Sequence, residues 1–79
     1  MDKLMAILSQ VRSDVDFTKE KALIDDGILD SFDIVSIIAE LSEEFEVTIS
    51  IDDMTPENFN SAEAMFALVE RILDEEYLN

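Results

Sequence analysis

The sequence contains no cysteine and no histidine, and it has a single glycine and a single proline. The first two absences exclude disulfide bonds, a thiolate nucleophile, zinc sites of the usual kind and a Ser-His-Asp triad. The scarcity of glycine and proline leaves few sharp turns, which favours helices over a many-turned β fold. No apolar run approaches the ~20 residues of a membrane span, and no signal-peptide pattern opens the chain. We therefore expect a cytoplasmic protein that does not enter a membrane.

Basic residues are also scarce, because five lysines and arginines face 20 aspartates and glutamates, for a formal net charge of -15. So acidic a surface repels nucleic-acid phosphates and anionic membranes, and nucleic acid is not an expected partner. It should instead steer the protein towards basic patches on other proteins. Hydrophobic residues make up 48% of the 79 residues. We therefore expect one packed domain over residues 1–79, present as a monomer.

Apolar residues at helical spacing predict a first helix over residues 2–13. Residues 14–29 show no sustained period but hold several large apolar side chains. This combination predicts a long loop that is anchored on a core. Asp30 is a good N-cap, so a second helix should begin after it and run to about Glu46.

The second half of the chain carries two further helix starts. Thr55 as a cap and Pro56 at the first helical position predict one short turn of helix within residues 52–59. A last helix should run from Ala62 to about Glu76. Its expected inward face consists of Met65, Phe66, Val69, Ile72 and Leu73. The predicted fold class is therefore all-α, with three main helices, one short helix and one long first loop.

A helical wheel of the second helix shows three groups of residues rather than two. The expected core stripe is Ile34, Ile38, Leu41 and Phe45, extended by Ile37. The expected solvated side is Asp33, Ser36, Glu40, Glu43 and Glu44. The third group is apolar and lies on the other side of Ser31 from the core stripe: Phe32, Val35 and Ala39. Either the first loop folds over this group with Ile28 or Leu29, or it forms an exposed patch for docking partners.

Ser31 stands where the turn becomes the second helix. A serine next to an N-cap aspartate commonly serves local capping only. However, Gly27 permits a tight backbone path before it, and the free N–H groups of a helix N-terminus favour a phosphate ester. Ser31 has no histidine, and no lysine close in sequence, to act as its base. If Ser31 has a chemical role, it is therefore the group on which another enzyme acts.

Three stretches carry a resemblance to a known family. They are Asp30-Ser31-Phe32, Glu43-Glu44-Phe45 and the segment from Met54 to Phe59. Together with the length, the helix plan and the acidity, they resemble acyl carrier and peptidyl carrier proteins. The resemblance implies an all-α, small four-helix bundle without catalysis of its own. It also implies that a transferase moves 4'-phosphopantetheine from coenzyme A onto Ser31, so that the arm supplies the thiol for a thioester.

The same resemblance implies which surface and which partners matter. Recognition residues on the second helix would be Asp30, Phe32, Asp33, Val35, Ala39 and Glu40. The implied partners are a phosphopantetheinyl transferase, an acyl- or aminoacyl-loading ligase or synthetase, and downstream acyl-transfer enzymes with basic docking patches. "ILDSF" is similar to the "LLDSF" stretch of D-alanine carriers, but the segment after Phe45 does not resemble theirs. Fatty acid, polyketide, peptide and D-alanyl cargo therefore all stay open.

Two other functions compete with the carrier interpretation. An EF-hand loop with Gly27 at its sixth position would place Ala22 first and Asp33 twelfth, which does not match its ligand pattern. The other alternative is an acidic protein-interaction domain without a prosthetic group. That domain would use the same carboxylates and would not need Ser31.

Overall fold

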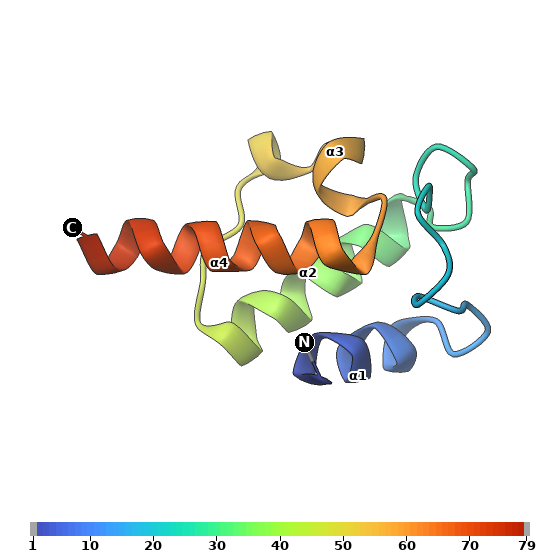
Figure 1. The fold of residues 1–79 in the computed structure, drawn as a ribbon, viewed down its shortest axis with the longest axis horizontal. Coiled ribbons are helices and arrows are strands. Elements are labelled where there is room, and N and C mark those ends of the chain that lie inside the picture. Colours follow the sequence, from blue (N-terminus) through green and yellow to red (C-terminus); the bar gives the residue numbers. More distant parts are fainter. Residues whose placement is uncertain (1, 79) are drawn as a thin grey trace.

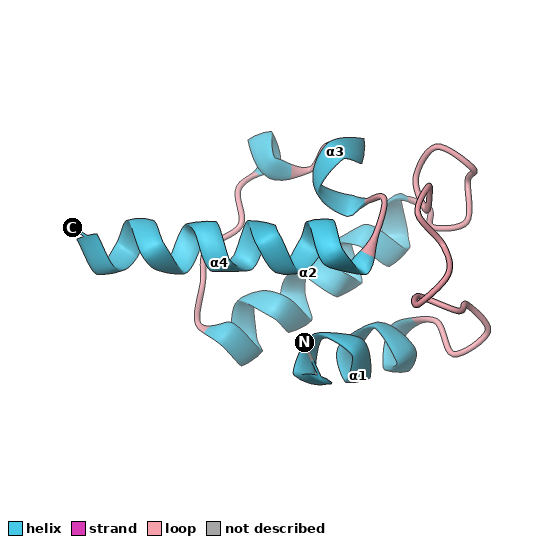
Figure 2. Ribbon diagram, viewed as in Figure 1, coloured by secondary structure: helices cyan, strands magenta, loops and turns pink. Residues whose placement is uncertain are grey.

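The computed structural model describes the backbone of residues 2–78 and the side chains of residues 2–50 and 52–75. These residues form helices and loops and contain no strand (Figures 1 and 2). In chain order the elements are α1 (Asp2–Val11), α2 (Ser31–Phe45), a 3-10 turn (Ile51–Asp53), α3 (Pro56–Phe59) and α4 (Ala62–Leu78). The predicted all-α fold, a small helical bundle with a long first loop, is therefore confirmed.

The longest helix, α4, runs along the long axis of the molecule (Figure 1). α1 packs against α2 and α4, and the short α3 packs against α4. The described chain measures 38 × 23 × 20 Å, and its Cα radius of gyration of 11.8 Å is that of a compact domain of this length. None of its described helices combines the length and the apolar character that crossing a bilayer requires.

The core is apolar and draws side chains from every α-helix and from the first loop. Its fully buried members include Leu4, Leu8, Leu23, Ile37, Leu41, Phe59, Met65, Leu68 and Val69. On α2 the buried centre is Ile37 and Leu41, whereas Ile34, Ile38 and Phe45 of the predicted stripe are only partly buried. The core stripe of α2 is therefore centred nearer Ile37 than the wheel predicted.

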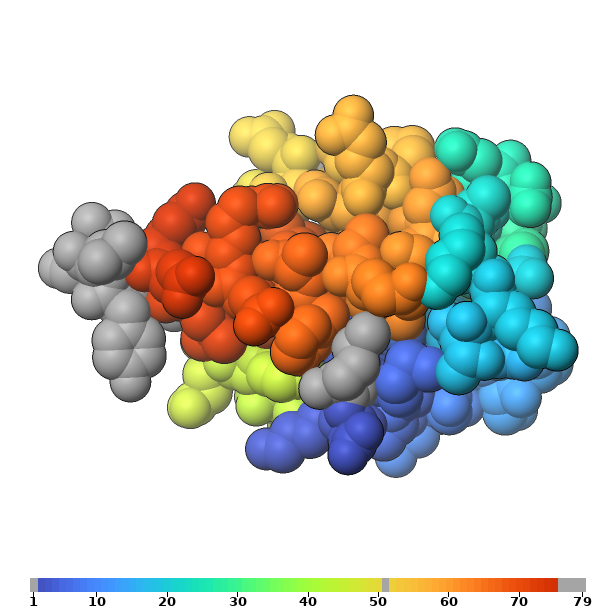
Figure 3. All heavy atoms as spheres, viewed as in Figure 1, coloured from blue at the N-terminus to red at the C-terminus, as the bar shows by residue number. Residues whose placement is uncertain are grey.

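The first loop closes the end of the bundle at which α2 begins (Figures 1 and 3). Phe17, Leu23 and Leu29 are buried in the core, as the predicted anchoring requires. The Asn60 side chain also holds the loop, since its Oδ1 accepts hydrogen bonds from the backbone N–H groups of Ile24 (2.9 Å) and Asp25 (3.1 Å). The loop is thus held to the rest of the structure by buried side chains and by Asn60.

Helix ends differ from the predicted ones by one or two residues. α1 ends at Val11 instead of residue 13, because the chain turns at Ser13 and Asp14. α2 ends at Phe45, and Glu46 follows in the left-handed conformation, with a φ of 53°. The predicted short helix is present as α3, although the Thr55 side chain makes no capping hydrogen bond.

Candidate functional site

The start of α2 is fixed by a reciprocal pair of aspartates. Asp30 is the N-cap, and its carboxylate accepts a hydrogen bond from the backbone N–H of Asp33 at 2.9 Å. In return the Asp33 carboxylate accepts the backbone N–H of Asp30 at 3.3 Å. This capping box satisfies two of the donors that a helix leaves free at its N-terminus. Ser31 is consequently the first residue of the helix, as the sequence predicted, and does not have to act as its cap.

Ser31 is exposed, and among the described residues its hydroxyl has no hydrogen-bond partner. The backbone N–H groups of Ser31 and Phe32 are also without an acceptor in the part of the chain that the structure describes. Gly27 precedes them with a φ of 70°, a left-handed conformation that a glycine adopts at little cost. A phosphate ester on this hydroxyl fits the site, because free N–H groups and the positive end of the helix dipole favour an anion.

An apolar surface lies next to Ser31 on α2. The Phe32 side chain is 78% exposed and that of Val35 is 58% exposed, and Ala39 is exposed as well. The first loop does not cover them, because Leu29 is buried in the core and Ile28 packs against it. Of the two arrangements that the sequence left open, the structure has the exposed one. We call Phe32, Val35 and Ala39 the apolar face of α2, and Glu40 is an exposed acid beside it.

Asp33 departs from its predicted place on the solvated side of α2. Its side chain is only 13% exposed and forms an ion pair with Arg12, at 2.7 Å between Nη1 and Oδ2. The wheel considered α2 alone, and the end of α1 covers this position. As a recognition residue, Asp33 is thus the least accessible of the six that the family resemblance implied, whereas Asp30, Phe32, Val35, Ala39 and Glu40 are all exposed.

Arg12, to which the sequence analysis gave no role, joins three segments near Ser31. Besides Asp33, its guanidinium donates to the backbone carbonyl of Ile28 at 3.0 Å and to both oxygens of Asp14 at 2.9 Å. The hydrogen bonds to Asp14 and Asp33 raise the pKa of Arg12 above its ordinary value, so it stays charged. Hydrogen bonding by Arg12 also lowers the pKa of Asp14. One signal in the sequence pointed here: Arg12 is one of only five basic residues in a very acidic chain.

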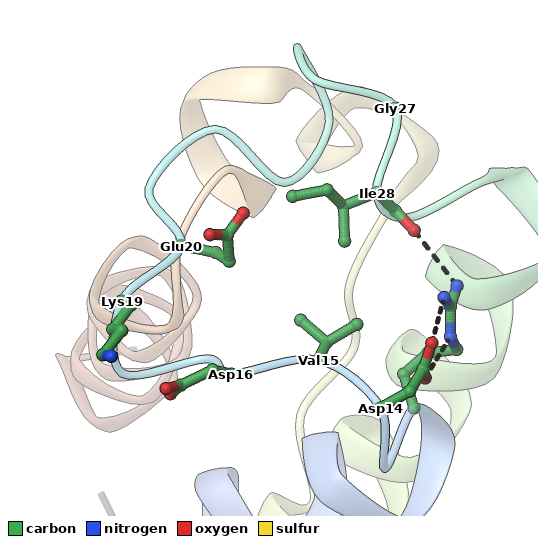
Figure 4. A pocket seen from close by; sticks show the side chains of 8 residues that line it. Asp14, Val15, Asp16, Lys19, Glu20, Gly27 and Ile28 are labelled. Atoms are coloured by element: carbon green, nitrogen blue, oxygen red, sulfur yellow. Dashed lines mark hydrogen bonds and ion pairs between the residues drawn. The ribbon is translucent and has the colours of Figure 1, made fainter.

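A surface hollow of about 470 Å³ lies within the first loop, and all the residues that line it fall between Arg12 and Ile28. Val15 and Ile28 point towards each other across it, and Glu20 lies on the opposite side from Asp14 (Figure 4). The hollow shares Arg12 and Ile28 with the network described above. The arginine that pairs with the first turn of α2 therefore also forms one wall of this hollow.

The carboxylates of the described residues do not gather into a metal site. Within the described residues there is no group of three or more carboxylates placed to hold a metal ion. At the start of α2 the structure places an accessible hydroxyl beside an exposed apolar face.

Comparison with known proteins gives the family. The family model described as "Phosphopantetheine attachment site" matches residues 2–69. Aminoacyl carrier protein 1 of Bradyrhizobium diazoefficiens is 38% identical over 63 residues, which are 80% of this chain and 69% of that protein. The D-alanyl carrier protein of Bacillus mycoides is 31% identical over 74 residues, 90% of this chain and 92% of that protein. No solved structure matches. The chain therefore belongs to the family of phosphopantetheine-binding carrier proteins, which hold a covalently attached 4'-phosphopantetheine group.

Proposed function

We propose that Ser31 is the attachment residue and that the modified protein carries an aminoacyl group between partner enzymes. One observation carries the first part of the proposal: at the first position of α2, next to an exposed apolar face, lies an exposed hydroxyl that has no hydrogen-bond partner among the described residues. The second part draws on the two relatives, which are named as carriers of aminoacyl and D-alanyl groups.

The attachment is a phosphoryl transfer that a separate enzyme catalyses. The Ser31 oxygen forms a bond to the coenzyme A phosphorus that bears the pantetheine arm. The bond from that phosphorus to the oxygen of adenosine 3',5'-bisphosphate breaks, and the hydroxyl proton leaves to a base of the transferase. This chain has no histidine, and no lysine lies near Ser31 in the sequence. Its own part is therefore to present the oxygen, while the transferase supplies the base.

The attached arm supplies a thiol, which holds the cargo as a thioester. The residues of the chain contribute recognition. Phe32 and Val35 offer apolar area to a partner, and Glu40 offers negative charge at the edge of that area. Charges at the rim of an interface mainly raise the association rate and select the partner, which leaves affinity low enough for turnover.

The proposed partners follow from this surface and from the family. They are a phosphopantetheinyl transferase, an enzyme that loads the amino acid, and a downstream acyl-transfer enzyme, each with a basic docking patch. The high negative charge of the chain supports such complementarity. A monomeric state, the cytoplasmic location and the absence of catalysis by the chain itself are further parts of the proposal.

The attachment is tested by weighing the intact protein after incubation with a broad-specificity phosphopantetheinyl transferase and coenzyme A. We expect a gain of one phosphopantetheine group in the wild type and no gain in Ser31→Ala. An equal gain in both would place the attachment on another residue. No gain in either would favour the acidic interaction domain, which also predicts that Ser31→Ala keeps full biological activity.

The cargo is tested on the protein purified from its native source, again by intact mass. An aminoacyl cargo predicts a species heavier than the holo protein by one amino-acid residue, which hydroxylamine removes by cleaving the thioester. A fatty acyl mass in its place would reject the aminoacyl part of the proposal and leave the attachment at Ser31 unaffected.

A further inference from the structure

Arg12 bridges three parts of the chain that meet around Ser31. It lies immediately after α1, and its guanidinium reaches the Ile28 carbonyl of the first loop and the Asp33 carboxylate of α2. A third interaction, with Asp14, uses the Nε and Nη2 atoms. The planar fork of an arginine can serve several acceptors at once, whereas the ammonium group of a lysine is a compact point charge. This geometry therefore depends on the identity of the residue as well as on its charge.

The network continues from Asp33 to the residue before Ser31. Asp33 Oδ2, which accepts the hydrogen bond from Arg12, also accepts the backbone N–H of Asp30. Asp30 in turn caps the N–H of Asp33. Ser31 lies between these two aspartates in the chain. The Arg12 guanidinium is therefore linked to the backbone next to Ser31 through a single residue, Asp33. The hydrogen bond from Arg12 to the Ile28 carbonyl holds the same segment at a second point, before Asp30 in the chain.

We propose that Arg12 is a positioning residue for the modification of Ser31, acting through Asp33 and the Ile28 carbonyl. This inference rests on the proposed attachment at Ser31. Under this proposal, Arg12 holds the backbone of residues 28–33 in the one conformation that presents the Ser31 hydroxyl to the transferase. The proposal also gives the Asp33 carboxylate a structural role within the fold. The carboxylates that contact a partner are then those of the other, exposed recognition residues.

The charge of the chain explains why this position needs an arginine. With 15 more acidic than basic residues, an Asp33 carboxylate that is largely removed from water would lack compensation without Arg12. A buried or partly buried charge that loses its partner destabilises its surroundings. The Ile28 carbonyl would lose its donor at the same time. Both effects act on residues 28–33, whereas Val35 and Ala39 of the apolar face lie outside that segment.

Positioning and docking therefore predict different kinetics. If Arg12 positions the hydroxyl, its removal lowers the fraction of bound carrier in the reactive arrangement, which lowers kcat. The KM for the carrier should stay near its wild-type value, because the exposed Val35, Ala39 and Glu40 lie outside residues 28–33 and remain available to a partner. Misplacement of a reacting group by a remote substitution commonly lowers a rate by one to two orders of magnitude.

The experiment measures transfer kinetics on the full chain, with a phosphopantetheinyl transferase, coenzyme A and intact-mass detection. The variants are Arg12→Gln, Arg12→Lys and, as the matched control, Arg71→Gln. Arg71 is an exposed arginine of α4 whose side chain, within the described residues, donates to Asn58 at 3.3 Å, so its substitution removes the same charge outside the Arg12 network. We expect kcat to fall about tenfold in Arg12→Gln, with KM within about twofold. Arg12→Lys should recover part of the loss, and Arg71→Gln should match the wild type.

Backbone hydrogen exchange measured by NMR supplies a second readout that a general loss of stability would not reproduce. In Arg12→Gln the Asp33 amide, which is bonded to the Asp30 side chain, should exchange faster, while amides in the middle of α4 should be unchanged. Equal acceleration in both places would assign Arg12 a merely structural role. A change in KM alone, or no change in kcat, would also overturn the proposal.

A coupling measurement keeps the test valid if Arg12→Gln does not fold. Asp33→Asn retains an oxygen that can accept the Asp30 N–H but loses the charge that pairs with Arg12. If both residues act through one contact, Arg12→Lys combined with Asp33→Asn should lower kcat little more than the stronger single substitution. If the two substitutions instead lower kcat by factors that multiply in the double variant, the coupling is refuted. Absence of modification in the wild type would reject the attachment at Ser31, which is a different outcome from equal rates in wild type and variants.

Discussion

Truncating the exposed aromatic side chain next to Ser31 gives the sharpest test of the docking surface. A phenylalanine that is 78% exposed presents about 150 Å² of apolar area to a partner. If a partner removes about half of this area from water, at about 25 cal/mol per Å², the side chain contributes about 2 kcal/mol to the complex. Phe32→Ala should therefore raise the KM of the carrier for the transferase about 30-fold. The isolated fold should be nearly unaffected, because Phe32 is not part of the core.

The assay measures initial rates of transfer across a series of carrier concentrations, together with a thermal melt of each variant. Met54→Ala is the matched control, since Met54 is an exposed apolar side chain in the segment before α3. We expect its KM to match the wild type. Equal KM values for Phe32→Ala and the wild type would refute the role of this face in docking. A Tm lowered by more than a few degrees in Phe32→Ala would show that the side chain packs within the fold.

Four further predictions concern charge, the ends of α2, the first loop and pH. Glu40→Lys should slow transfer at low salt and much less at high salt, because it removes electrostatic steering; stopped-flow association rates measure this. Glu46→Gly should raise stability by about 1 kcal/mol, seen as a higher Tm, since a non-glycine residue at a φ of 53° is strained. Asn60→Ala should lower the free energy of unfolding in urea by about 2 kcal/mol, because two backbone N–H groups lose their acceptor. Hydrogen bonding by Arg12 lowers the pKa of Asp14 in the folded protein. The stability that the ionised Asp14 carboxylate gives the fold is therefore present above its ordinary pKa of about 3.9 and is lost as the pH falls through the lower pKa of the folded state. In thermal melts at acid pH, the Tm of Asp14→Asn should therefore fall less with decreasing pH than the Tm of the wild type.

The positions of the helices followed from local features of the sequence. Asp30 and Asp33 stand three residues apart at the start of α2, and their side chains form the capping pair that such spacing favours. Pro56 begins α3 for a similarly local reason, since its fixed φ suits the first position of a helix. Interactions of this kind are completed within one turn of chain. They depend little on how the rest of the molecule folds, and a sequence alone is enough to find them.

The accessibility of the site was less predictable because it depends on other segments. The wheel placed Asp33 on the solvated side, yet the residue after α1 covers it from 21 positions away in the sequence. The same wheel left open whether the apolar face of α2 was covered by the first loop. That question depended on where Leu29 packs, and Leu29 lies in the core. Contacts between distant segments thus determined which residues near Ser31 can meet a partner.

The position of the N-cap explains how the segment around Ser31 can both start a helix and leave the serine hydroxyl exposed. If Ser31 were the N-cap, its hydroxyl would accept a backbone N–H of the first turn and would be partly occupied. Asp30 takes that position instead, and its carboxylate forms the hydrogen bond. Ser31 is thereby shifted to the first helical position, where neither its hydroxyl nor its N–H has a role within the helix. The aspartate before the serine therefore leaves the Ser31 hydroxyl without a capping role, and Arg12, through Asp33, supports that aspartate from outside the helix.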